Sequence, residues 1–246
     1  MIKILKKNKK IILYFFILLS LMSFINTINK SLVNGCDFQW RPAVLFWEGI
    51  NHYNRAILFG TDFLCQNGEY AHLLQVLYYP FTKFSWETAR LLWLMINLFL
   101  TFLIPICICK HLKISGYKTI LLILIFITCY PTRHSLYNGQ QSLFVLFFLI
   151  LPFISNSKIA TFFSGFSYVK YSTGYVLFLN FISEKKFKNL IISCIPYLFG
   201  WIFYFLYTNS DPILNFFEPI LLSLKKGYIR DGDVYSLINI YFVPLQ

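Results

Sequence analysis

A series of long apolar runs, separated by short polar gaps, is the feature that most constrains the fold of this chain. Hydrophobic residues make up 57% of the 246 residues and charged residues only 13%, which is about half the charged fraction of typical soluble domains. Such runs require lipid as the surrounding solvent and exclude a water-soluble enzyme. They cover residues 11–28, 89–109, 119–130, 142–154, 159–169, 173–182 and 189–207, and a further run opens near Ser236.

The first run has the features of a retained membrane anchor. No small-residue cleavage pattern follows it, and five lysines precede it: Lys3, Lys6, Lys7, Lys9 and Lys10. We therefore predict an anchor at 1–28 with a cytoplasmic N-terminus. Several later runs are shorter than the ~20 residues of a straight spanning helix, but tilted or broken helices tolerate this beside other protein. The sequence thus predicts an all-α, multi-pass integral membrane protein.

Lysine clusters in the polar gaps predict the orientation of the spans. One cluster, at 110–118, follows the second run, and another, at 184–188, follows the sixth. The positive-inside rule makes both gaps cytoplasmic. On this map nearly all of the net charge of +12 is inside, so the charge reports insertion and not a nucleic-acid partner. The segments predicted to face outward are 29–88, 133–141, the neighbourhood of Lys170, and 209–235.

We predict a single membrane domain over residues 1–246, in the cell (inner) membrane. Its parts are the anchor at 1–28, an external or periplasmic loop at 29–88, a helical bundle at 89–207, and a last external loop with the start of a further span at 208–246.

Six cysteines do not form a disulfide framework in this sequence. Four of them lie in apolar runs, where a thiol is usually a small hydrophobe. Cys36 and Cys65 share the outer loop, where an oxidising compartment could let them pair. The sequence does not establish this bond, and two free thiols are the alternative. No cluster has the spacing of a metal site, and no cofactor site is expected.

Asp37 lies where the outer loop leaves the membrane, just before a short apolar helix predicted at 42–48. Pro42 suits the first turn of that helix and Gly49 the position after its end. A carboxylate there has two interpretations. It caps the helix or pairs with Arg41, which the loop alone favours, or it is a general base facing a lipid-borne substrate.

A second outward turn, at 131–141, contains Arg133, His134, Asn138 and Gln140 directly before an apolar helix. Amides at such a position can bind hydroxyls or anions. The alternative is an ordinary turn, in which Asn138 and Gly139 supply the bend.

Lys170 lies between two apolar runs. An ionisable side chain at membrane depth is by default a functional candidate, although a lysine can also extend to the interface for structural reasons. The predicted topology places Asp37, the amides at 138–140 and Lys170 on one side of the membrane. A base, hydroxyl-binding amides and a cation are what glycosyl transfer from a lipid phosphate needs.

In order and spacing, several short motifs resemble glycosyltransferase family 87. These are integral membrane GT-C enzymes that include polyprenol-phosphate-mannose-dependent mannosyltransferases. The resemblance runs from about residue 35 to 188. It rests on Asp37, EGINHY at 48–53, YYPF at 78–81, WETARLLWLMIN at 86–97, GQQS at 139–142, and Gly165 with Lys170.

The resemblance implies a GT-C-like helical bundle and an inverting transferase that uses no cofactor. The resemblance implies a polyprenyl-phosphate sugar as the donor, with mannose as the sugar. The acceptor would be a lipid or a cell-envelope glycan. Asp37 matches the acidic residue that the family uses as base. The candidate substrate-binding residues are Lys170, Gln140, Asn138, Arg133, His134 and Arg41.

Two other classes of function remain open from the sequence. A transporter or flippase for a lipid-linked glycan would bind the same substrates without chemistry, although carriers hold their polar groups near mid-bilayer. A truncated, non-catalytic homologue is the other alternative, because family members are longer and this sequence ends soon after Ser236. A second chain supplying further helices would be an additional partner.

Overall fold

The described part of the chain is mostly helical, as the sequence predicts. The computed structural model describes residues 9–53, 66, 70–214 and 216–218, and no strand occurs among them. The chain divides into two compact units. The first comprises residues 1–38 and 90–143, and the second comprises residues 39–89 and 144–246.

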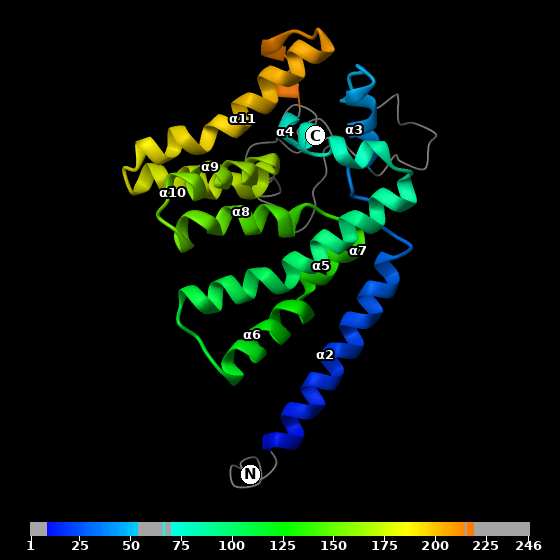
Figure 1. Cartoon of the computed structure of the whole chain (residues 1–246), viewed down its shortest axis with the longest axis vertical. Helices are drawn as coiled ribbons and strands as arrows, with labels where there is room; N and C mark the ends of the chain where they lie inside the picture. The colour runs from blue at the N-terminus through cyan, green and yellow to red at the C-terminus, as the bar shows by residue number, and fades with distance from the viewer. Residues whose placement is uncertain (1–8, 54–65, 67–69, 215, 219–246) are drawn as a thin grey trace, which may run out of the picture. The chain divides into compact units, whose positions relative to one another are not determined.

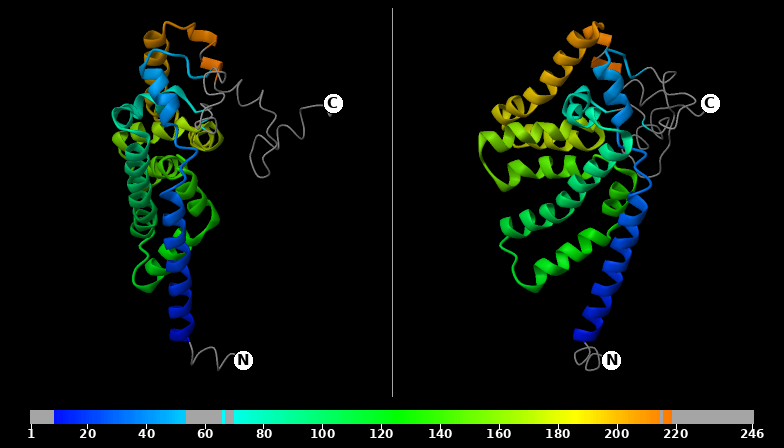
Figure 2. Two further views of the ribbon diagram at one scale, coloured as in Figure 1. Left: turned by 90° about the vertical axis from the view of Figure 1, so that its right-hand side faces the viewer. Right: turned by 45° about the vertical axis from the view of Figure 1, so that its right-hand side comes forward.

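Four helices make up the part of the first unit that the structure describes. They are α2 (Lys9–Ser31), most of α5 (Trp86–His111), α6 (Tyr117–Thr128) and α7 (Tyr130–Asn138) (Figure 1). Helix α2 contains the predicted anchor run, packs against both α6 and α7, and is a single unbroken helix in both views of Figure 2.

Helices α6 and α7 are separated by a bend of 53°. The bend lies at Cys129, which has an extended conformation, and Pro131 follows in the first turn of α7. Proline has no N–H to donate to the carbonyl four residues back, and its ring clashes with that carbonyl, so a continuous helix is broken here. The turn predicted at 131–141 is wrong for most of that segment, because Tyr130–Asn138 is helical and only the residues after it turn.

Among its described residues, the second unit contains shorter elements and one long helix, where η denotes a short 3₁₀ helix. The elements are α3 (Trp40–Trp47), α4 (His72–Leu77), η2 (Tyr79–Lys83), α8 (Ser142–Ile154), α9 (Lys158–Ser164), η3 (Gly165–Val169), α10 (Tyr171–Ser183) and α11 (Phe187–Thr208). The predicted run at 159–169 is therefore two elements, α9 and η3, that meet at Gly165.

Two glycines let α11 pack closely against its neighbours in the second unit. A Cβ atom at Gly165 would lie 2.0 Å from the carbonyl oxygen of Ser193 in α11, and one at Gly200 would lie 2.5 Å from Cα of Leu73 in α4. Backbone therefore meets backbone at both crossings, as is common where helices associate in a membrane.

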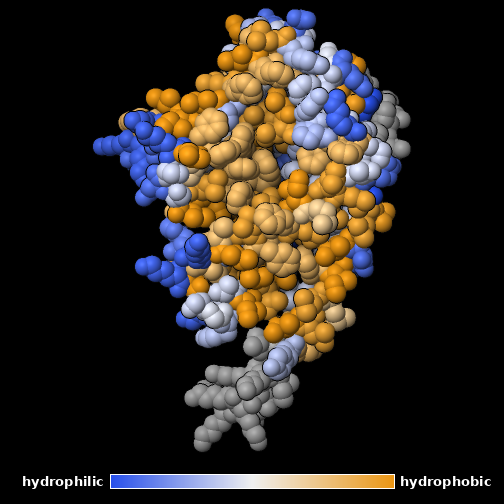
Figure 3. Space-filling view, in the orientation of Figure 1, coloured by the Kyte–Doolittle hydropathy of each residue, from blue (hydrophilic) through white to orange (hydrophobic). Residues whose placement is uncertain are grey.

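Two helices among the described residues are long and apolar enough to cross a membrane. They are α5, with 26 residues, and α11, with 22; the bent pair α6 and α7 would be a third if it forms one broken span. Apolar side chains dominate the face drawn in Figure 3. The protein is thus an all-α membrane protein, while the number of passes and their orientation remain predictions.

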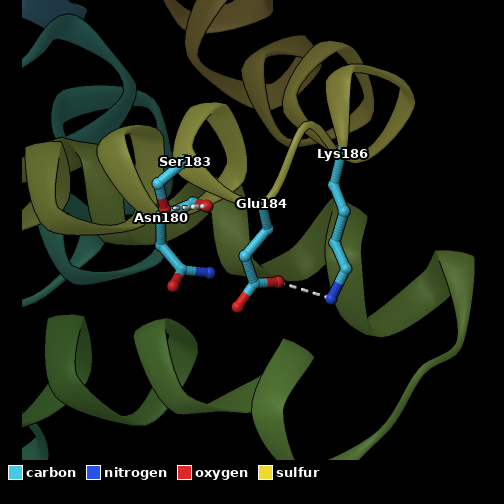
Figure 4. A network of polar contacts seen from close by, with 4 residues as sticks. All are labelled: Asn180, Ser183, Glu184 and Lys186. Carbon is cyan, nitrogen blue, oxygen red and sulfur yellow. Dashed lines mark hydrogen bonds and ion pairs between the residues drawn. The ribbon is translucent and has the colours of Figure 1, made fainter.

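The turn between α10 and α11 is one of the gaps predicted to be cytoplasmic. Glu184 pairs with Lys186 there, and Ser183 donates a hydrogen bond to the carbonyl oxygen of Asn180 at 2.9 Å (Figure 4). Lys185 adopts a positive φ of 57°, which reverses the chain between the two helices.

We expect Gly165→Ala to destabilise the second unit by about 1–3 kcal/mol, because the added methyl group has no room against the backbone of α11. Thermal unfolding in detergent, followed by circular dichroism, measures this. Ile191→Ala is the control, since Ile191 lies on α11 and is 67% exposed. Equal unfolding temperatures for Gly165→Ala and the wild type would show that the helices do not cross at Gly165.

Candidate functional site: the segment that carries Asp37

Two hydrogen bonds hold the backbone of Asp37 against the turn that follows α7. The Asp37 N–H donates to the carbonyl oxygen of Asn138 at 2.8 Å, and the Asp37 carbonyl accepts from Nε2 of Gln141 at 3.0 Å. The donor and the acceptor of this one residue are therefore both fixed by the same turn. The Asp37 side chain is partly exposed, and it extends from a backbone that these two bonds hold in place.

Glycines on both sides allow this close approach. Gly139 has φ 67° and ψ 28°, the left-handed conformation that ends α7, and a Cβ atom there would lie 3.1 Å from Cβ of Phe38 and 3.3 Å from Cα of Gly35. Gly35 has φ 119°, and its Cβ would lie 2.8 Å from Cδ of Arg90. Both conformations favour glycine.

Helix α5 also contacts the segment at 33–38 and the turn after α7. Its Trp93 donates from Nε1 to the carbonyl oxygen of Gly139 at 2.8 Å and stacks on Phe38, with ring centroids 5.5 Å apart. Arg90 donates from Nη1 to the carbonyl oxygens of Val33 and Asn34. Phe38 and Trp93 are both buried. Asp37 therefore lies on a short segment that α5 and the turn after α7 hold together.

Asp37 does not cap the short helix that follows it. Helix α3 begins at Trp40, two residues earlier than predicted, and its N-cap residue is Gln39, without a side-chain capping bond. Pro42 is thus the third residue of the helix. Gly49, with φ 77°, follows the end of the helix as predicted.

Three of the predicted binding residues lie on α7 and the turn after it, and one of them, Asn138, contacts Asp37. Asn138 accepts the Asp37 N–H through its carbonyl, and its side-chain Nδ2 is 2.9 Å from Nε2 of His134. Gln140 is the second residue after α7; its N–H donates to the carbonyl of Ser135 at 2.9 Å, a helix-ending bond.

Arg133 faces the anchor helix. Its Nη1 donates to Oγ of Ser23 in α2 at 2.8 Å. This guanidinium therefore joins α7 to α2, a role that the sequence did not predict.

Lys170 and Arg41 belong to the second unit. Lys170 is the residue between η3 and α10, with φ −117°, so it lies at a break between helices and not inside a span. The N–H of Arg41 donates to Oε1 of Gln66 at 2.7 Å. Whether these residues share a site with Asp37 stays a prediction.

Gln141 is the residue of this site that the sequence analysis missed. It is fully buried, and its amide reaches the Asp37 carbonyl, whereas the neighbouring Gln140 is partly exposed. In the sequence, nothing distinguishes Gln140 from Gln141, so the sequence alone does not show which of the two is buried. The left-handed Gly139 decides which of them points inward.

The structure shows the state of five of the six cysteines. Cys36, next to Asp37, is disulfide-bonded. Cys65, the cysteine with which the sequence could pair it, lies outside the described residues. Cys107, Cys109, Cys129 and Cys194 are free thiols, as expected. In the described part of the chain, no group of three or more histidine, cysteine or acidic side chains could hold a metal ion.

A buried polar cluster in the second unit joins the segment at 51–53 to α11. Nδ1 of His52 lies 3.2 Å from the hydroxyl of Tyr204, which is itself 3.3 Å from Oδ1 of Asn51; Nδ2 of Asn51 donates to Glu218 at 3.2 Å. The rings of Tyr204 and His72 are in contact, with centroids 4.6 Å apart. His52 and His72 are each only 1% exposed.

Burial lowers the pKa of His52 well below its ordinary value, and the nearby His72 lowers it further. The unfolded chain therefore binds a proton below about pH 6.5 that the folded chain excludes. We expect the unfolding temperature to be level above pH 7 and to fall from pH 6.5 to pH 5, as measured by circular dichroism in detergent.

His52→Gln is expected to flatten this dependence, and His111→Gln is the control, because His111 is exposed at the end of α5. The other ionisable groups that face His52 are Tyr53, His72 and Tyr204. An unchanged pH dependence in His52→Gln would contradict the assignment to His52.

The comparisons with known proteins agree with the resemblance seen in the sequence. The model of glycosyltransferase family 87 matches residues 71–242, more than half of the chain. The matched range contains the turn after α7 and Lys170, whereas Asp37 and Arg41 precede it. No curated protein and no solved structure matches the chain. The chain belongs to glycosyltransferase family 87 and is a membrane glycosyltransferase.

Proposed function

We propose that this glycosyltransferase transfers a hexose from a polyprenyl-phosphate donor to a lipid or cell-envelope glycan at the outer face of the cell membrane. The resemblance to family members that use mannose donors makes mannose the proposed sugar. The observation that carries the proposal is the two-sided backbone contact of Asp37 with Asn138 and Gln141. A carboxylate at the end of the anchor helix, with its backbone so held, suits a base that meets a lipid-borne substrate.

The reaction is a single displacement with inversion. An acceptor hydroxyl attacks the anomeric carbon on the face opposite the phosphate, while the bond from that carbon to the phosphate oxygen breaks and its electron pair leaves with the polyprenyl phosphate. Asp37 accepts the proton of the hydroxyl. The leaving group is already good, so the protein needs to orient the hydroxyl, accept the proton and stabilise the phosphate charge.

The remaining candidates bind substrate in this proposal. Gln140 and Asn138 orient hydroxyl groups at the turn beside Asp37. Lys170 of the second unit, together with His134, Arg133 and Arg41, provides positive charge or hydrogen-bond donors to the phosphate or the sugar.

We expect Asp37→Asn to lower the rate of transfer by about 10²–10⁴-fold, because the amide cannot accept the proton. The measurement is transfer of radiolabelled mannose from polyprenyl-phosphate mannose in proteoliposomes, with the anomer of the product determined by NMR.

Asp211→Asn is the matched control. Asp211 is exposed, is likewise predicted to face outward, and accepts the N–H groups of Ile213 and Leu214 through an oxygen that asparagine retains. Wild-type transfer by a normally inserted Asp37→Asn variant would remove Asp37 as the base. Movement of the intact donor across the membrane without transfer by the wild type would favour a flippase.

We expect Gln141→Ala to lower kcat by roughly tenfold and to change KM for the donor much less, because it removes one of the bonds that position Asp37. Gln140→Ala is the comparison, and it is expected to act mainly on KM. Steady-state kinetics in proteoliposomes measure both, and circular dichroism shows whether each variant is folded. A folded Gln141→Ala enzyme with unchanged kcat would contradict the positioning role.

A further inference from the structure

An open depression lies at the end of the anchor helix α2, next to the segment that carries Asp37. Its volume is about 490 Å³, and its lining residues are Asn29, Lys30, Val33, Asn34 and Tyr137. All five belong to the first unit. None of the five was a candidate binding residue in the sequence analysis, and none is acidic.

Three of these side chains carry hydrogen-bond donors that no group in the described part of the chain accepts. They are the ammonium group of Lys30, the amide of Asn29 and the hydroxyl of Tyr137. Lys30 and Asn29 are exposed, and Tyr137 is 38% exposed. A cation, an amide and a phenol that converge without an acidic partner are complementary to an anion with several acceptor oxygens, such as a phosphate.

A lysine in the last turn of a helix often donates hydrogen bonds to the unpaired carbonyl groups there. In α2 other donors already bind these carbonyl groups. The carbonyl of Lys30 accepts the N–H groups of Val33 and Asn34, and that of Ile28 accepts the N–H of Leu32. Arg90 donates hydrogen bonds to the next carbonyl groups, those of Val33 and Asn34. The ammonium group of Lys30 is therefore available for a ligand.

The depression shares a wall with the Asp37 contact. Nδ2 of Asn34 donates to Oδ1 of Asn138 at 3.4 Å, and the carbonyl of Asn138 accepts the N–H of Asp37. One residue of the turn thus joins the lining of the depression to the proposed base.

An apolar helix surface leads to the depression. Exposed aromatic and aliphatic side chains line much of α2: Tyr14, Phe15, Phe16, Leu18, Leu19, Leu21, Met22 and Ile25. Val33, in the lining itself, is 81% exposed. A ligand with a long hydrocarbon tail and a charged head can place its tail in the bilayer along such a helix and its head at the interface.

From these observations we propose that the depression binds the phosphate group of the polyprenyl phosphate, with Lys30 as its cation and Asn29 and Tyr137 as further donors. This inference rests on the proposed function and adds to it a phosphate site within the first unit, beside Asp37.

The test is binding of undecaprenyl phosphate, without any transfer, to the full chain in phosphatidylcholine nanodiscs. We expect Lys30→Gln to weaken binding about tenfold, as for the loss of one charge-assisted contact, and Lys30→Arg to retain it. Undecaprenol, which has no phosphate, is expected to bind Lys30→Gln and the wild type equally. Inorganic phosphate and phosphatidylglycerol are the competitors, and neither should displace the lipid phosphate at equal concentration.

Lys110→Gln is the matched control. Lys110 is also an exposed lysine in the last turn of a long apolar helix of the first unit, and it is predicted to lie on the opposite side of the membrane. An equal loss in Lys110→Gln and Lys30→Gln would overturn the proposal, because it would report net charge alone.

Two further outcomes separate the inference from the function on which it rests. Tight binding by the wild type and by Lys30→Gln alike would overturn the Lys30 site and leave the proposed function standing. Wild-type protein that binds undecaprenyl phosphate no better than undecaprenol would overturn both. Displacement by inorganic phosphate or phosphatidylglycerol would overturn the choice of a polyprenyl phosphate as ligand.

Discussion

The proposed site depends on the close approach of two backbone segments, 35–38 after α2 and 138–141 after α7. The carbonyl of Asn138 and the amide of Gln141 hold Asp37 at both ends of its backbone, and Gly35 and Gly139 leave the room that these bonds need. Helix α5 stabilises the arrangement through Arg90 and Trp93. These bonds fix the backbone from which the Asp37 carboxylate extends, and a general base needs such a fixed position.

Membership of the glycosyltransferase family and the geometry of the first unit support the same function from different parts of the chain. The family match covers residues 71–242 and does not include Asp37. The bonds that hold Asp37 come from the turn at 138–141, which lies inside the match. The depression at Lys30 adds a cation at the end of the anchor helix. Asp37, the turn and Lys30 all belong to the first unit.

Periodicity and composition predicted the helices well because long apolar runs leave few alternatives in lipid. The run at 142–154 corresponds to α8 residue for residue. Helix α7 was missed because its polar sequence, with Pro131 near the start, resembles a turn, and only packing against α2 favours a helix there. The contact of His52 with Tyr204 joins positions about 150 residues apart, which a single sequence does not reveal. Lys30 lies in the segment at 29–88 that the sequence predicts to face outward, and no motif of the sequence distinguishes it.

The central claim is that the turn after α7 acts on catalysis through Asp37. A double-mutant cycle on kcat for mannosyl transfer, with Asp37→Asn and Gln141→Ala alone and together, tests it most directly. If Gln141 acts by positioning the carboxylate, the double variant will be no slower than Asp37→Asn alone, because the base is already lost. If the two losses multiply, Gln141 acts independently of Asp37, and the account is contradicted.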